Sequence, residues 1–342
     1  MDVRILDCTL RDGGYYNKWD FDSDLVNDYL LAMASAGVDY VELGLRQFRN
    51  DQYLGASAYT TYEYLARLSL PDGPTYGVMV DAKTILASGD SQEECVNALF
   101  RDRNEEKISL VRIAAHFHEV SECFQMVCAL KAKGYLVGLN IMQASLRGSS
   151  ELTAITKLVS DWNKVDVLYF ADSLGSMGAD DIERVYKAMR CSWSGDIGFH
   201  AHNNIGEAIA NVNCAIALGC VWVDGTVTGM GRGAGNAEIE YLLQQPRIQF
   251  KAKELDDLSG LVINYFEPLK KHHGWGLSMI YYSSAKLGIH PSYIQELCSE
   301  VNLDRRQIPK IIGDLGLLEH PHVFAKSTLD NVISKTNNDV AI

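Results

Sequence analysis

The sequence lacks paired cysteines, and this absence argues against a disulfide scaffold. Its eight cysteines form no CxxC pair, and the closest spacings are Cys123 to Cys128 and Cys214 to Cys220. With 342 residues, of which 47% are hydrophobic and 22% charged, the chain has an ordinary globular composition and can form a core without disulfide bonds. We therefore expect a reduced protein in the cytoplasm.

Long apolar runs are missing as well. The longest stretch without a charged residue, Ala208 to Val223, contains two asparagines and is shorter than the ~18 residues that a membrane helix needs. No basic and then apolar leader precedes the strand-like residues that begin at Val3. The sequence therefore predicts neither a membrane span nor export.

Basic residues are in deficit, with 31 Lys and Arg against 44 Asp and Glu, so the net charge is −13. Such a surface repels phosphate backbones and anionic membranes, which excludes nucleic acid and membrane surfaces as expected partners. A small anionic substrate is not excluded, because a bound cation and one or two arginines can reverse the field locally.

Short β-branched runs alternate with helical periodicity through the first two thirds of the chain. The expected strands are Val3–Cys8, Val38–Leu43, Thr75–Val80, Ile108–Ala114, Tyr135–Ile141, Val165–Phe170, Gly195–His200 and Cys220–Gly225. Eight such strands within about 250 residues predict a (β/α)8 TIM barrel. After about Arg247 only helical spacing remains. We expect a catalytic barrel domain at residues 1–250 and an all-helical C-terminal domain at residues 251–342.

Polar residues follow the carboxyl ends of the expected strands, where barrels carry their active sites. They are Arg11 with Asp12, Glu42, Asp81, His116, Asn140, Asp172, His200 with His202, and Asp224 with Thr226. Asp172 either lines the pocket or caps the next helix.

Four of the polar residues predict a metal site. His200 and His202 are two residues apart, so on a strand both imidazoles point to the same side. Strands seven, eight and one are neighbours in a closed barrel, which brings Asp12 and the loop residue Asn236 to these histidines. This N/O set suits Mn²⁺, Mg²⁺ or Co²⁺ better than structural Zn²⁺. The alternative is two hydrogen-bonded histidines in a polar barrel mouth.

Arg11 is a candidate for stabilising an oxyanion beside this metal. A structural ion pair with Glu42 is the alternative, and both can hold, because the pair would orient the arginine. The glycine-rich segment Gly229 to Gly235 resembles a phosphate cradle only weakly, since it lacks the lysine of a P-loop.

Five motifs, in order along roughly the first 245 residues, resemble those of the DRE-TIM metallolyases. They are Ile5 to Gly14 (ILDCTLRDGG), Val41-Glu42, Asp172 to Gly175 (DSLG), His200 to Asn203 (HAHN) and Gly229 to Asn236 (GMGRGAGN). Within that family the length and helical tail are most similar to 4-hydroxy-2-oxovalerate aldolase. The last loop lacks the cysteine of hydroxymethylglutaryl-CoA lyase, and the chain is too short for the regulatory domain of isopropylmalate synthase.

The resemblance implies roles for individual residues. Asp12, His200 and His202 would bind the divalent metal, most simply Mn²⁺, with Asn236 as a further ligand. Arg11 would stabilise an enolate, and Glu42 would be the signature glutamate. The related aldolases work with an aldehyde dehydrogenase, which is therefore a candidate partner, and we expect a homo-oligomer.

The chain departs from those aldolases in its proton-transfer residues. Tyr15 stands where they have a histidine two residues after the glycine Gly13. It is either a catalytic group or an apolar pocket wall. In the aromatic tail, Tyr282 or His290 is expected to close over the barrel mouth and supply a proton.

These observations together predict a lyase. The expected reaction is reversible aldol cleavage of a 4-hydroxy-2-oxo acid to an aldehyde and the enolate of pyruvate, with Asn140, Asp172 and His290 binding substrate. One alternative is a Claisen-type condensation of an acyl-CoA with a 2-oxo acid. The other is a barrel subunit that keeps the metal only for stability.

Overall fold

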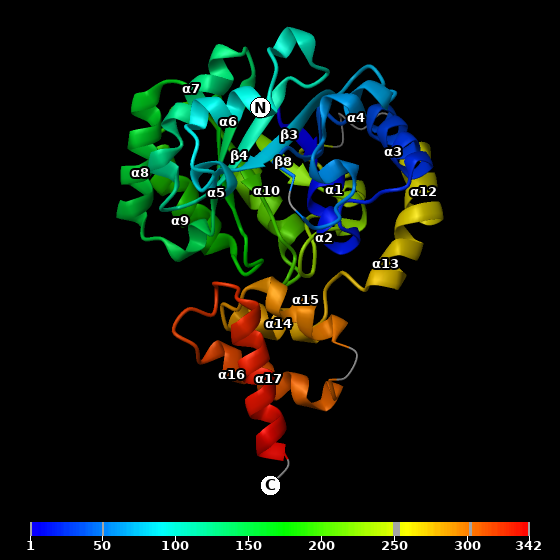
Figure 1. Cartoon of the computed structure of the whole chain (residues 1–342), viewed down its shortest axis with the longest axis vertical. Coiled ribbons are helices and arrows are strands. Elements are labelled where there is room, and N and C mark those ends of the chain that lie inside the picture. The colour runs from blue at the N-terminus through cyan, green and yellow to red at the C-terminus, as the bar shows by residue number, and fades with distance from the viewer. Residues whose placement is uncertain (1, 50, 249–253, 301–302, 341–342) are drawn as a thin grey trace.

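The computed structural model describes residues 2–49, 51–248, 254–300 and 303–340. Eight parallel strands form a closed barrel in which each strand pairs with the next and β8 pairs with β1, which confirms the predicted (β/α)8 fold (Figure 1). The strands are β1 (Arg4–Asp7), β2 (Tyr40–Leu45), β3 (Thr75–Asp81), β4 (Leu110–His116), β5 (Leu136–Met142), β6 (Val167–Ala171), β7 (Asp196–His200) and β8 (Trp222–Gly225).

The period of two along each strand decides which side chains enter the barrel. On β4, Val111 and Ile113 belong to the main core between strands and helices, whereas Leu110 belongs to a separate cluster inside the barrel. Arg112 and His116 share the inward face with Leu110. From its start to its end, the inward face of β4 therefore carries the apolar Leu110, the buried charge of Arg112 and the pocket residue His116.

Helices surround the barrel in the expected alternation (Figure 1). Those up to the end of the barrel are α1 (Thr9–Asp12), α2 (Gly14–Asn17), α3 (Ser23–Ala36), α4 (Tyr62–Arg67), α5 (Ala82–Leu86), α6 (Gln92–Leu99), α7 (Phe124–Ala132), α8 (Ser149–Trp162), α9 (Ala179–Arg190), α10 (Ala208–Leu218) and α11 (Ile239–Leu242). Capping fixes several starts: Asp22 accepts from two backbone N–H groups of α3, and Ser91 forms a capping box with Glu94 at α6.

The first helices after the expected domain boundary pack on the barrel rather than in a separate unit. They are α12 (Asp256–Leu261), the π-helical turn η6 (Val262–Phe266) and α13 (Glu267–His273). Leu258, Leu261 and Phe266 join the barrel core, and Tyr265 donates a hydrogen bond to Asp28 of α3. The expected boundary between residues 250 and 251 itself lies outside the described residues.

A second core begins with α14 (Met279–Lys286) and continues through α15 (Pro291–Ser299), α16 (Ile308–Gly316) and α17 (Lys326–Val340). Figure 1 shows these helices as a lower unit beneath the barrel. The unit contacts the loops at the carboxyl ends of the strands: Tyr281 lies 3.3 Å from Tyr16 between hydroxyl oxygens, and Gln143 donates to the His322 carbonyl. It therefore covers one side of the active face. Among the described helices, none is both long and apolar enough to cross a bilayer.

Candidate active site

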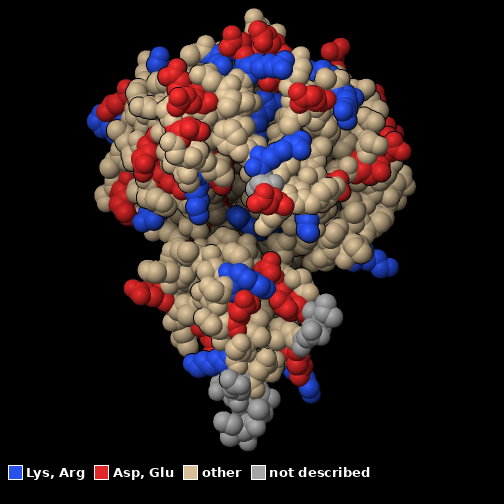
Figure 2. All heavy atoms as spheres, viewed as in Figure 1, with Lys and Arg blue, Asp and Glu red and all other residues tan. Residues whose placement is uncertain are grey.

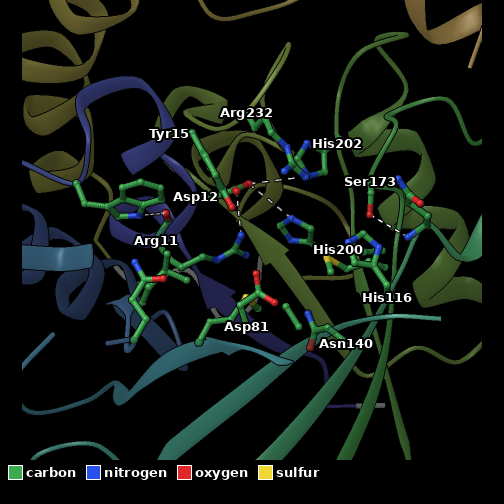
Figure 3. Close-up of a pocket in the computed structure, with 18 of the residues that line it drawn as sticks. Arg11, Asp12, Tyr15, Asp81, His116, Asn140, Ser173, His200, His202 and Arg232 are labelled. Carbon is green, nitrogen blue, oxygen red and sulfur yellow. Dashed lines mark hydrogen bonds and ion pairs between the residues drawn. The ribbon is translucent and has the colours of Figure 1, made fainter. Parts of the chain in front are cut away.

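A cavity of about 330 Å³ opens at the carboxyl ends of the strands. It receives side chains from strands or loops on every side of the barrel and from the lower helical unit (Figure 3). The polar lining residues are Arg11, Asp12, Tyr15, Gln47, Gln52, Asp81, His116, Asn140, Gln143, Ser173, His200, His202, Arg232 and His290.

The short helix α1 positions Arg11 and Asp12. It follows β1 directly, and the N–H of Thr9 donates to the carboxylate of Asp7 at 2.8 Å. The hydroxyl of Thr9 accepts from the N–H of Val227 at 2.8 Å, which ties α1 to the loop after β8. All residues of α1 are buried. The first and last strand loops are therefore locked together where the site is built.

Asp12, His200 and His202 converge as the sequence predicted. Their candidate ligand atoms lie within 4.8 Å of one another, and all three residues are buried. Nε2 of His200 lies 3.6 Å and Nε2 of His202 lies 3.9 Å from Oδ2 of Asp12. Asn236 pairs with His202 in an isolated β-bridge and places its side-chain amide 2.6 Å from the same carboxylate oxygen.

The donor set fits a divalent cation. Nε2 of His200 and Oδ1 of Asn236 are buried without a hydrogen-bond partner, so each has an unused ligand atom. Nδ1 of His200 is held by Asp224 at 2.9 Å, which is the outer contact that fixes a metal-binding histidine. Two imidazoles, a carboxylate and an amide oxygen favour an N/O-binding ion with open positions.

Charge and burial favour metal-binding forms of these groups. Burial alone raises the pKa of Asp12, but the charge of Arg11 and the nearby imidazoles of His200 and His202 outweigh it and hold the pKa well below its usual range. Burial lowers the pKa of His202 to about 3. An ionised carboxylate and a neutral imidazole are the forms in which these residues bind metals.

Arg11 faces the pocket from a fixed position. Its Nε donates to Glu42 at 2.7 Å and its Nη1 donates to Asp12 at 2.9 Å, whereas Nη2 is buried without a partner. The expected ion pair with Glu42 therefore exists, and it leaves the Nη2 amino group of Arg11 free. Glu42 is fully buried and does not line the cavity, so it acts on the site through its arginine partners rather than by contact with substrate.

A second arginine supports this arrangement from below. Arg112, also fully buried, donates to both oxygens of Glu42 at 2.8 and 2.9 Å and to Asp224 at 2.6 Å. Asp224 in turn holds His200. Gly138 leaves room for this arginine, since a Cβ at that position would lie 3.0 Å from its Cγ. Arg112 thereby links the arginine and histidine halves of the site.

A second HxH sequence, His116-Phe117-His118, follows β4 and differs from the first. The two imidazole rings are stacked with centroids 5.8 Å apart, and the His118 side chain is 74% exposed. Among the described residues, the candidate metal groups include His200 and His202 but neither of these histidines. Spacing alone therefore does not make a metal site, and convergence with Asp12 does.

Three further predicted site residues lie in the cavity wall. Asn140, at the end of β5, is buried and its Oδ1 has no partner. His290 enters from the lower unit as the N-cap of α15. Tyr15 packs edge to face on Trp19, with ring centroids 4.9 Å apart, and stands next to Asp12 and Arg232 in Figure 3.

The structure does not bring Asp172 or Tyr282 to the cavity. Asp172 is buried and accepts from the N–H groups of Ser176 and Met177 in the loop before α9. It has neither expected role, because it does not line the cavity and the N-cap of α9 is Gly178. Burial raises its pKa to about 7. Tyr282 is 45% exposed on α14 beside Lys286, because its neighbour Tyr281 takes the inward position.

Sequence reasoning overlooked Arg112 and Arg232. The signal for Arg112 is a lone charge in the middle of the apolar strand β4, since a buried arginine needs partners. The signal for Arg232 is a long cationic side chain between Gly231 and Gly233. Gln143, which was also overlooked, has a positive φ of 53° at the cavity wall.

The comparisons with known proteins agree with this geometry. The HMGL-like family model matches residues 93–257. The 4-hydroxy-2-oxovalerate aldolase of Thermus thermophilus is 30% identical, over 70% of this chain and 67% of its own. The oxaloacetate decarboxylase of Mycobacterium tuberculosis is 29% identical, over 74% of this chain and 73% of its own.

A solved structure extends the similarity into the helical unit. The N-terminal domain of a candidate aldolase from Bacteroides vulgatus superposes with a TM-score of 0.78 and 29% identity. The match covers 87% of this chain and 97% of that one. Together with the buried Asp12, His200 and His202 beside Arg11, these similarities identify the chain as a member of the HMGL-like (DRE-TIM) family.

Proposed function

We propose that this protein is a divalent-metal-dependent aldolase that cleaves or forms 4-hydroxy-2-oxo acids through the enolate of pyruvate. The observation that carries the proposal is the buried set Asp12, His200 and His202 at the cavity, with the free Nη2 of Arg11 beside it. Relatives named 4-hydroxy-2-oxovalerate aldolase support the reaction class.

The buried ligand set would hold the cation, with Asn236 as the fourth protein ligand. When bound, the cation acts as a Lewis acid that draws electron density from the 2-oxo group. Arg11 supplies the complementary hydrogen bond, because its Nη2 is already oriented by Glu42 and needs no rearrangement when negative charge develops on the enolate oxygen.

The other wall residues bind substrate and move its proton. Asn140 offers an unpaired amide oxygen, and His290 closes the cavity from the helical unit. Tyr15 is the candidate for proton transfer at the 4-hydroxyl, because it has the sequence position of the family histidine and lies beside Asp12. Tyr282, on the outer face of α14, has no part in this step.

The proposal extends to the cofactor and the setting. Mn²⁺ is the proposed ion, because the ligands mix nitrogen and oxygen donors without a thiolate. All eight cysteines are free in the structure, which supports a reduced, cytoplasmic setting. A homo-oligomer and an aldehyde dehydrogenase partner remain predictions from the sequence.

Deuterium exchange tests the proposal. The Mn²⁺-loaded protein should exchange the methyl protons of pyruvate with D₂O, because forming the enolate is half of the aldol reaction. NMR should show the methyl signal decay, and EDTA should abolish the decay. Absence of exchange, combined with release of free thiol from an acyl-CoA and a 2-oxo acid, would replace the aldolase with the Claisen reaction.

Gly231→Ala should weaken Mn²⁺ binding about 10- to 100-fold, the usual effect of disturbing the surroundings of metal ligands. A Cβ at this position would lie 2.3 Å from Nδ2 of Asn236 and 2.9 Å from Oδ2 of Asp12, so both side chains must move. Equilibrium dialysis with Mn²⁺ measures the change.

Gly260→Ala is the matched control, because a Cβ there meets nothing within 4 Å and the residue lies in α12, far along the chain from the ligands. It should bind Mn²⁺ like the wild type. Equal affinity in both variants would contradict the tight approach of the glycine-rich loop to the ligands.

A further inference from the structure

The loop after β8 carries an arginine, Arg232, whose side chain lines the cavity. The proposed aldolase reaction gives this arginine no role. Arg232 stands between Gly231, where a Cβ would lie 2.3 Å from Nδ2 of Asn236, and Gly233, where a Cβ would lie 2.7 Å from Pro291. Neither glycine position has room for a side chain. Arg232 is thus the side chain that this tight turn directs into the cavity.

The guanidinium of Arg232 has no anionic partner among the residues that the structure describes. Its Nε is buried and makes no hydrogen bond, and the group lies over the ring of Tyr15, 5.1 Å from the ring centroid. Arg11, in contrast, is neutralised by Glu42 and Asp12. A partly buried guanidinium without a carboxylate is costly unless an anion occupies the space beside it.

His290 adds a neutral hydrogen-bond donor to the same end of the cavity. Its Nδ1 accepts from the N–H of Ser292 at 3.2 Å, so the ring carries its proton on Nε2. Burial and, to a smaller extent, the charge of Arg232 lower the pKa of His290 to about 2, which keeps the ring uncharged.

Arg232 and Arg11 lie on opposite sides of Asp12 in Figure 3. Figure 3 shows Arg232 beside His202 and Tyr15, with Asp81 on the far side of the cavity. Figure 2 shows a hollow where the barrel meets the helical unit, with blue basic atoms inside it. An extended substrate whose oxo-acid end lies at the cation site and Arg11 can therefore direct its other end toward Arg232.

We propose that Arg232 and His290 form a second anion subsite, so that the substrate is a 4-hydroxy-2-oxo acid with an additional carboxylate or phosphate at its aldehyde-derived end. This inference rests on the proposed aldolase function and specifies its substrate class. The shared chemistry is an oxyanion held by a guanidinium and an imidazole N–H.

Calorimetric titration of the Mn²⁺-loaded full chain tests the subsite without turnover. The matched ligands are 2-oxoglutarate and 2-oxovalerate, which have the same chain length and differ in the second carboxylate. We expect the wild type to prefer 2-oxoglutarate, and Arg232→Met to reduce the ratio of the two affinities about 10- to 100-fold, as for loss of a hydrogen bond to a charged group. Arg232→Lys should restore part of the ratio.

Equal affinities in the wild type, or an unchanged ratio in Arg232→Met, would overturn the subsite. If the subsite is confirmed, condensation rates with pyruvate distinguish carboxylate from phosphate. A carboxylate subsite favours glyoxylate over acetaldehyde, and a phosphate subsite favours glyceraldehyde 3-phosphate over glyceraldehyde. Loss of pyruvate exchange in the wild type would overturn the aldolase function alone, because the affinity ratio still decides the subsite.

Discussion

Replacing Arg11 with lysine should slow deuterium exchange into pyruvate about 10²- to 10³-fold, the usual cost of one oriented oxyanion donor. Lysine keeps the charge but loses the planar fork that binds Glu42 through Nε and Asp12 through Nη1 while leaving Nη2 free. The ammonium group cannot serve both carboxylates and the enolate oxygen at once. NMR exchange rates at saturating Mn²⁺ measure the loss.

Arg46→Lys is the matched control for this variant. Arg46 is also buried, donates to Glu106 at 2.8 Å and to the carbonyl of Thr60, and does not line the cavity. It should lose stability as Arg11→Lys does but retain exchange. Near-normal exchange in Arg11→Lys, or an equal loss in both variants, would contradict the proposed role of Arg11.

Replacing Arg112 with methionine should lower the free energy of unfolding by about 3–5 kcal/mol, the usual cost of removing one partner from a buried ion pair. The arginine is fully buried and neutralises Glu42 and Asp224 together, so its loss leaves two carboxylates with reduced compensation in the barrel interior. Urea unfolding followed by tryptophan fluorescence measures the change.

Arg4→Met gives the contrast in an exposed pair. Arg4 begins β1, at the end of the barrel away from the cavity, and pairs with Asp196 of β7. Its side chain is 44% exposed, so solvent screens the two charges. Its removal should cost at most about 1 kcal/mol. If Arg112→Met were as mild as Arg4→Met, the buried charge network would not support the site.

The fold was predictable because its signal is repeated along the chain. Each strand alternates with a helical segment, and the eight expected strands differ from the observed ones by one or two residues at most ends. Strand order in a closed barrel then places β7, β8 and β1 side by side, which is why Asp12, His200, His202 and Asn236 could be assigned to one site from the sequence.

The parts that could not be predicted depend on packing between segments. Tyr281 and Tyr282 are adjacent in an aromatic run, and only the helix phase of α14 decides that Tyr281 meets Tyr16 and Tyr282 faces solvent. The sequence also could not show that α12 would pack on α3, because amphipathic helices look alike whichever core they join. The role of Arg232 could not be predicted, because the sequence does not show that its guanidinium has no carboxylate partner among the described residues.

The most direct test of the account is Mn²⁺ binding measured by electron paramagnetic resonance on the wild type, His202→Ala and His118→Ala. Each substitution removes one histidine from an HxH sequence. The two histidines have the same chemistry, but His202 lies next to Asp12 and His118 does not. We predict one tight site per chain that is lost in His202→Ala and kept in His118→Ala. A wild-type chain that binds no Mn²⁺, or a His202→Ala variant that binds it normally, would contradict a metal centre at Asp12, His200 and His202.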